Sequence, residues 1–442
     1  MTKYVNSSEA VTSNLLLWEP LHTQTSIQDT KVMEYFPQTS IDYSDTINFD
    51  IPGHPKLMIE HIEIVSEIRV LTADNGNPVA NTNVSVVSNL ANALWRNVEI
   101  VVGGQNLVQS FDNSYNIGSW FDIVLNSAPD RQDYLWSKEG FLMDDVSSKN
   151  HSENMQFYPV APENEEAVPA WAVVNPNGRV RADRIAGGNR VILTTDLNCS
   201  LFKQGKLLPT NLDVAISLTK NYNGYIVMEA AATHKIQFDK VYLRVTFQQP
   251  TDFALHLIVL KLKNQPAIYQ AEKGMVSFHS IPAGNEQITF NNIFSGNLPV
   301  MFIFAIQDRA AYGKSTNKNP YTFKHMRKVQ VYINGQEHFS RALEKHPHDD
   351  AVMLDALYQA IGYKNAGSCL ITSKKILTHQ MVAVNLTADR NANKHHLNLN
   401  KTGEVKIDIE LPQAAEEGLI LLIYAYYDRI IEINSDRRVR EI

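Results

Sequence analysis

Hydrophobic and polar residues alternate along much of the chain from about residue 46 onward. The alternation is clearest at 62–70, 212–218, 241–247 and 405–411. A period of two predicts antiparallel strands with one face on a core and the other in water. Residues 302–306 and 419–424 are almost continuously apolar, which predicts strands buried on both faces. Long helical patterns are absent, so the sequence favours an all-β architecture over parallel βαβ units.

One strand-and-turn motif occurs twice. The sequence RNVEIVVGGQ at 96–105 reappears as RKVQVYINGQ at 327–336. Each copy alternates β-branched residues and ends in a glycine-containing turn, which predicts a β-hairpin. A short amphipathic helix is predicted after each hairpin, with Ile117, Trp120, Phe121 and Val124 facing the core in the first copy and Leu354, Leu357, Tyr358 and Ile361 in the second. Any two hairpins share some features, but the shared Arg and Gly-Gln and the common order indicate two copies of one domain.

The length of the chain agrees with this duplication. At 442 residues it exceeds the size, roughly 250–300 residues, at which single cores stop growing. We therefore expect an N-terminal arm at 1–45, a first domain at 46–249 and a second domain at 250–442. The stretch 130–190 is poorly periodic and rich in Asn, Pro and Gly, which is typical of a long excursion loop.

The charge of the chain argues against a protein whose main task is to bind nucleic acid. The formal net charge is −7, and the first 45 residues carry two lysines against six carboxylates. A protein that grips a phosphate backbone needs the opposite balance. One basic stretch contains Arg179, Arg181, Arg184 and Arg190, and we interpret it as a solvated loop rather than a nucleic-acid contact.

Cysteine content and hydropathy indicate in which cellular compartment the protein folds. Cys199 and Cys369 are the only cysteines, so neither a disulfide framework nor a zinc site is predicted. The sequence has no signal-peptide pattern and no apolar window near the ~18 residues of a membrane span. We expect folding in a reducing compartment, with the Asn-x-Ser/Thr sites at Asn83, Asn198 and Asn385 unmodified.

Candidate catalytic and metal-binding groups are few. His346, His348, Asp349 and Asp350 form the densest group of possible metal ligands, and His395-His396 forms another, but both are interpreted as polar loops. Asp144-Asp145 offers paired carboxylates without other signs of a sugar-cleaving site. Residues 185–188 fit a loose viral-protease cleavage pattern, for which a glycine turn is the preferred interpretation. No catalytic, cofactor-binding or metal-binding residue is assigned.

An ordered series of short segments stands out along the chain: LWEP at 17–20, EYFP at 34–37, INFDIPG at 47–53, the hairpin at 98–105, AYG at 311–313 followed by NPYTF at 319–323, and YAYYD at 424–428. In this order the segments resemble the major capsid proteins of Polinton/Maverick elements and adintoviruses. The resemblance spans most of the chain and is weakest at 130–190.

This resemblance implies a double jelly roll, with two tandem eight-stranded antiparallel sandwiches and short helices in their loops, as in the lineage of adenovirus hexon. It further implies a structural protein without enzymatic activity. Three chains would form a homotrimer, a pseudo-hexameric capsomer that tiles an icosahedral shell. The implied partners are neighbouring capsomers, penton and minor capsid proteins, with no strong direct binding of nucleic acid. The implied location is the virion, assembled inside the host cell and not secreted.

Two other functions suit the same architecture. A glycan-active hydrolase built on two jelly rolls should show carboxylates that converge on a cleft. A carbohydrate-binding or attachment protein should show exposed aromatic residues in loops, for which Trp136 and Trp171 are candidates. Trp120 is better explained as part of the buried face of the first short helix.

Overall fold

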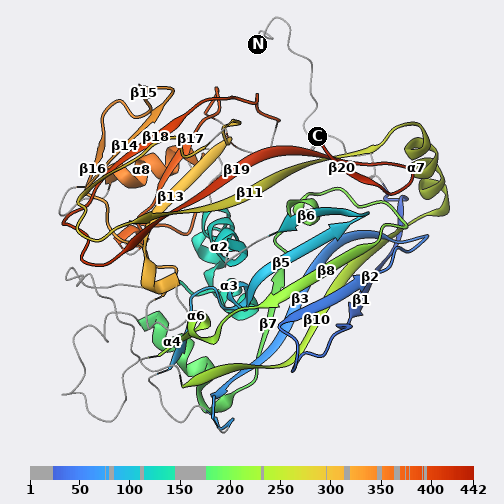
Figure 1. The fold of residues 1–442 in the computed structure, drawn as a ribbon. Helices are drawn as coiled ribbons and strands as arrows, with labels where there is room; N and C mark the ends of the chain where they lie inside the picture. The colour runs from blue at the N-terminus through green and yellow to red at the C-terminus, as the bar shows by residue number, and fades with distance from the viewer. Residues whose placement is uncertain are drawn as a thin grey trace, which may run out of the picture.

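The computed structural model describes residues 23–74, 76–78, 84–109, 114–144, 176–229, 233–294, 296–312, 319–345, 351–362, 369–373, 375–377, 379–390, 392 and 396–442. Within these residues, the first half of the chain forms two four-stranded antiparallel sheets, ordered β1-β10-β3-β7 and β2-β8-β5-β6 (Figure 1). The strands are β1 (Ile27–Tyr35), β2 (Thr46–Ile51), β3 (Met58–Thr72), β5 (Trp95–Val102), β6 (Gln105–Gln109), β7 (Val191–Asp196), β8 (Val214–Lys220) and β10 (His234–Pro250). A separate short pair joins β4 (Ser85–Val86) to β9 (Val227–Met228).

The second half repeats this arrangement, with sheets ordered β11-β19-β13-β17 and β12-β18-β14-β15. Its strands are β11 (Ala267–Ile281), β12 (Gln287–Phe290), β13 (Met301–Asp308), β14 (Lys328–Ile333), β15 (Gln336–Glu337), β17 (Val382–Asn385), β18 (Val405–Glu410) and β19 (Leu419–Ile433). The short strands β16 (Leu343–Glu344) and β20 (Val439–Glu441) extend the two sheets. If the eight main strands of each half are numbered along the chain, both halves have the order 1-8-3-6 and 2-7-4-5. The duplication predicted from the hairpin motif therefore extends to the whole topology.

The two copies of the hairpin share their turn geometry as well. Gly103 and Gly104 connect β5 to β6 with φ of 52° and 85°, and Asn334 and Gly335 connect β14 to β15 with φ of 51° and 78°. Two successive residues with positive φ form the type I′ turn, which fits the twist of a two-residue hairpin. Glycine and asparagine tolerate this backbone region best, which explains why the repeat retains them.

Both predicted amphipathic helices are present. Helix α2 (Ser114–Asn126) buries all four predicted positions, including Trp120 and Phe121. Helix α8 (Ala351–Ala360) has a slightly rotated buried face, because Met353, Leu357 and Ala360 are its buried residues. Ile361 follows the end of α8 and packs against the core only in part.

The remaining helices lie in connections. They are α1 (Leu90–Ala93), α3 (Gln132–Glu139), α4 (Pro176–Ile185), α5 (Ser200–Lys203), α6 (Asn223–Ile226) and α7 (Asp252–Asn264), with 3₁₀ turns η2 (Pro129–Arg131), η5 (Ala186–Gly188), η6 (Arg309–Tyr312) and η7 (Lys375–Leu377). Helix α7 links β10 of the first half to β11 of the second half (Figure 1). Among the residues described here, no helix combines the length and apolar character needed to cross a membrane.

The structure describes parts of the predicted N-terminal arm at 1–45 and of the predicted excursion loop at 130–190. Residues 27–35 of the predicted arm form β1, which pairs with β10 at the edge of its sheet. At the two ends of the predicted excursion, α3 and α4 are helical. The apolar runs at 302–306 and 419–424 are buried in β13 and β19, as their composition predicted.

The interpretation of the arginine stretch as a solvated loop is wrong. Most of it is helix α4, and Arg181 is fully buried. A buried guanidinium is tolerated because it is paired: Arg181 contacts Asp144 and donates to two main-chain carbonyls. Arg190 is exposed and lies within 3.6 Å of Glu67 and 3.3 Å of Asp239.

Candidate functional site: the contact between the two halves

Helix α2 of the first half lies between its own sheets and those of the second half (Figure 1). Its Trp120 ring stacks on Tyr321 at 6.0 Å and meets Phe323 edge-on at 5.2 Å. The next residue, Phe121, stacks on Tyr424 of β19 at 5.4 Å. All five rings are at least 96% buried, so the contact is a continuous aromatic core rather than a surface seam.

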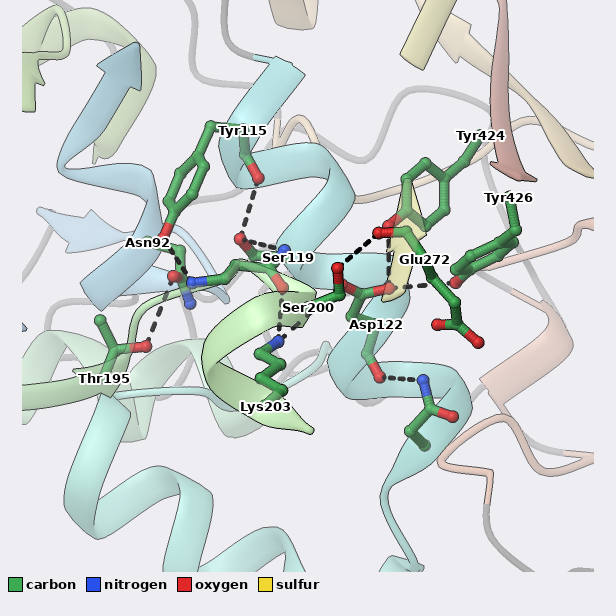
Figure 2. A network of polar contacts seen from close by, with 12 residues as sticks. Asn92, Tyr115, Ser119, Asp122, Thr195, Ser200, Lys203, Glu272, Tyr424 and Tyr426 are labelled. Atoms are coloured by element: carbon green, nitrogen blue, oxygen red, sulfur yellow. Dashed lines mark hydrogen bonds and ion pairs between the residues drawn. The ribbon is translucent and has the colours of Figure 1, made fainter. Parts of the chain in front are cut away.

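A carboxylate on the same helix binds two tyrosines of the second half. The Asp122 Oδ1 atom accepts hydrogen bonds from the Tyr424 hydroxyl at 2.8 Å and the Tyr426 hydroxyl at 3.1 Å (Figure 2). Burial raises the pKa of each tyrosine well above the ordinary value for a tyrosine. Both hydroxyls therefore stay protonated and can donate hydrogen bonds. Lys203 of α5 lies 3.9 Å from Asp122 and supplies a positive charge. These bonds fix the orientation of β19 against α2.

Helix α5 adds a second polar contact beside the first. The Ser200 hydroxyl donates to the main-chain carbonyl of Glu272 in β11 at 2.6 Å (Figure 2). One strand residue has no side chain at this point: a Cβ atom on Gly274 would lie 2.4 Å from the Tyr424 hydroxyl. Glycine at this position therefore lets Tyr424 reach Asp122.

At another point, a buried ion pair of the first half binds a segment of the second half. Asp144 accepts from Arg181 at 2.5 Å through one oxygen and from the Asn319 side chain at 2.6 Å through the other. Thr322 donates to the same carboxylate at 3.3 Å. Arg181 and Asp144 both belong to the first half, and Asn319 and Thr322 belong to the second, so the pair anchors the 319–323 segment.

Asn116 connects the aromatic core to this anchor. Its Oδ1 atom accepts from the hydroxyls of Tyr225 and Tyr321, each at 2.9 Å. Tyr225 comes from the first half and Tyr321 from the second. The contact therefore combines stacked rings with directed hydrogen bonds, which makes one relative orientation of the halves strongly preferred.

Solved structures share this arrangement of strands. A chain of the Sputnik virophage has a TM-score of 0.64 and 11% identity, over 99% of this chain and 93% of that one. For the PBCV-1 virus capsid the TM-score is 0.59 and the identity 13%, over 96% of this chain and 98% of that one. For the mavirus major capsid protein the TM-score is 0.54 and the identity 11%, over 100% of this chain and 96% of that one. No protein-family model matches the sequence, and no curated protein is significantly similar to it.

The chain has a double jelly-roll fold. This confirms the all-β fold class predicted from the alternating pattern and the double jelly roll that the family resemblance implied. In double jelly-roll terms, each half is one jelly roll, and α2 belongs to the first.

Many of the candidate site residues lie outside the part of the double jelly roll that the structure describes. Residues 346–350, Asp145, Trp171, Asn83 and His395 lie outside the described part of the chain. His396 is exposed and lies 3.1 Å from Asp389. Trp136 is half-buried, with the Arg184 guanidinium 4.5 Å above its ring. Residues 186–188 form a glycine turn, in which Gly187 and Gly188 have positive φ.

Both cysteines of the double jelly roll are buried and free. Burial raises the pKa of the Cys199 thiol, and it raises that of Cys369 to about 11, so neither is a reactive thiolate at neutral pH. Asn385, which begins an Asn-x-Thr triplet, is 7% exposed and donates to the Ala360 carbonyl at 3.0 Å.

One group of side chains has the composition of a metal site. Ligand atoms of His61, Glu63 and Asp196 lie within 4.8 Å of one another. The Lys138 ammonium lies 2.9 Å from Glu63 and 2.8 Å from Asp196, in the place a cation would take. The His61 and Lys138 contacts hold the pKa of Asp196 below its usual range, despite its burial. The group therefore acts as an ion-pair network that joins α3 to β3 and β7.

Proposed function

We propose that the chain is a viral major capsid protein that assembles as a homotrimer. The observation that carries the proposal is the pair of jelly rolls with one strand order, held side by side by a buried contact within a single chain. Three such chains place six similar jelly rolls around a threefold axis, so a trimer can fill a sixfold position in an icosahedral shell. The likeness to capsid chains over nearly their whole length supports this function.

Exposed apolar surface supports assembly with further copies. Helix α7 leaves Phe253 74% exposed, and Leu257 and Leu260 are also exposed. Strands β1 and β11 each lie at one edge of their sheets, with Val32 and Met275 more than half exposed. Long edges with apolar residues are normally covered in the functional state, since they otherwise pair with foreign strands.

The net negative charge fits a capsid protein of a virus in which other proteins neutralise the charge of the genome. Asp and Glu number 47 against 40 Lys and Arg. We propose penton and minor capsid proteins as further partners, and the virion, assembled inside the host cell, as the location. The segments at 17–53, 311–323 and 424–428 support placement near the Polinton/Maverick and adintovirus capsid proteins.

A glycan hydrolase on the same fold is less well supported. The carboxylate considered for acid–base work, Asp144, is 2% exposed and pairs with Arg181 and Asn319. A general acid must reach the substrate, and this carboxylate lies in a core contact.

The solution mass of the purified protein tests the proposal. The chain mass is 49.9 kDa, so a trimer gives 3 × 49.9 ≈ 150 kDa by light scattering. The trimer should persist on dilution, because the interfaces of shell subunits are large. A mass of one chain at every protein concentration would contradict the proposal.

A further inference from the structure

A hollow of about 620 Å³ opens beside the connection between β1 and β2. This volume lies within the range of ~300–1,000 Å³ found for small-molecule sites. The floor comes from the end of β8 and the start of β10, and one side comes from the loop at 41–45. The residues that the argument uses are Asp42, Tyr43, Arg96, Lys220, Tyr222 and Gln237.

Two tyrosines give the hollow an aromatic rim. Tyr43 is 94% exposed, which is unusual for a large ring. Tyr222 is also exposed, and the Arg96 guanidinium lies 4.6 Å above its ring and donates to its hydroxyl. The exposed Tyr43 ring offers a surface on which the C–H face of another ring can stack, whereas the Arg96 guanidinium covers one face of Tyr222.

The loop that carries Tyr43 is tied to the floor. The Lys220 main-chain N–H donates to the Asp45 carbonyl at 2.8 Å, and its ammonium donates to the Ile41 carbonyl. The Gln237 amide donates to Asp42 at 3.3 Å. A loop fixed at both ends loses little conformational entropy when a ligand binds.

The charges of the lining balance. The lining contains two carboxylates, Asp42 and Asp45, and two cations, Arg96 and Lys220. Two cations disfavour a metal ion, and two carboxylates disfavour a phosphate or another anion. Carboxylate, amide, guanidinium and hydroxyl groups together can both accept and donate hydrogen bonds, which suits a neutral ligand with several hydroxyls.

We propose that this hollow binds a neutral sugar, a hexose or N-acetylhexosamine unit of a glycan, with its ring stacked on Tyr43. Asp42, Arg96 and Gln237 would hydrogen-bond its hydroxyls. The hollow includes Asn223, the first residue of α6 (Asn223–Ile226). This part of the molecule lies far from α7 and from the C-terminus (Figure 1). The proposed sugar site is separate from the proposed capsid function, because all of its lining residues come from one chain and the hollow forms without assembly.

Saturation-transfer NMR on the full chain tests this inference. The probes are methyl glycosides of glucose, galactose, mannose and N-acetylglucosamine, with sialic acid and inorganic phosphate as anionic comparisons. We expect transfer to at least one neutral sugar, competed by excess of the same sugar. Tyr43→Ala should weaken that binding about tenfold, because a stacking surface is lost. Its ring is exposed, so the fold should not change.

Tyr134→Ala is the matched control, since Tyr134 is an exposed tyrosine on α3 that does not line the hollow. This variant should bind like the unmodified chain. The inference is overturned if no neutral sugar shows transfer, if Tyr43→Ala binds as well as Tyr134→Ala, or if phosphate or sialic acid binds better than every neutral sugar. The light-scattering mass of the same samples reports assembly separately, so failure of sugar binding and failure of the capsid function are distinguishable.

Discussion

The indole ring of Trp120 stacks on the phenol ring of Tyr321 across the two jelly rolls, with centroids 6.0 Å apart and planes 13° from parallel. Trp120 belongs to the first jelly roll and Tyr321 to the second, and both are almost completely buried. The contact is therefore a shared core, and we expect the two jelly rolls to unfold together rather than as independent domains.

Replacement of Trp120 by Ala should destabilise both jelly rolls at once. Removal of a fully buried Trp leaves a cavity and typically costs about 3–5 kcal/mol. Chemical unfolding followed by circular dichroism measures the loss. Trp136→Ala is the control, because Trp136 is only half-buried. A Trp120→Ala loss no larger than that of Trp136→Ala would show that the shared core matters little.

Arg181→Met should be more harmful alone than together with Asp144→Asn. The single change leaves the buried Asp144 carboxylate without its cation, for which a loss of about 3–5 kcal/mol is typical. In the double variant the amide is neutral and its oxygen can still accept from Asn319. Free energies of unfolding for the four proteins of the cycle give the coupling. Additive losses would rule out a charge effect.

His379 should make the protein sensitive to acid. It is buried against the Trp120 ring at 5.8 Å, and burial lowers its pKa to about 4 from the ordinary 6.5. Between these values the unfolded chain binds a proton that the folded chain does not, so stability falls as pH falls from 6.5 to 4, by at most about 3 kcal/mol.

The matched variant for this prediction is His379→Gln, which cannot titrate. Its free energy of unfolding should fall less between pH 7 and pH 4 than that of the unmodified chain. Equal pH profiles for the two proteins would show that His379 is not responsible.

Glu139 should have the opposite pH dependence. Burial, reinforced by the charge of Asp196, raises its pKa to about 7 from 4.5. The folded chain therefore holds a proton that the unfolded chain releases, and stability falls as pH rises from 4.5 to 7. Glu139→Gln should be more stable than the unmodified chain at pH 8, by at most about 3 kcal/mol, and similar to it at pH 4. Thermal unfolding at both pH values measures the difference, and a variant less stable at pH 8 would contradict the prediction.

The fold was predictable from the sequence because its determinants are periodic and local. Alternation fixes the buried face of strands such as β3 and β18, and the hairpin at 96–105 recurs at 327–336 with its turn residues. Helix α8 shows the limit: spacing alone did not distinguish Leu354 from Met353 as a buried position, because tertiary packing rotates the helix.

The contact between the jelly rolls was less predictable because its partners are far apart in sequence. Asp122 and Tyr424 lie 302 residues apart, and no local pattern links them. The NPYTF segment at 319–323 was noted only as a family resemblance, although Asn319, Tyr321 and Phe323 hold the two jelly rolls together. The burial of Arg181 was missed because its partner Asp144 is 37 residues away.

Electron microscopy of the purified protein tests the central claim most directly. Class averages of the peak near 150 kDa, three times the chain mass of 49.9 kDa, should show a ring with six similar lobes, two from each chain. Particles with only two lobes in every class would be isolated double jelly rolls, and that result would contradict the proposal that this chain builds a capsid.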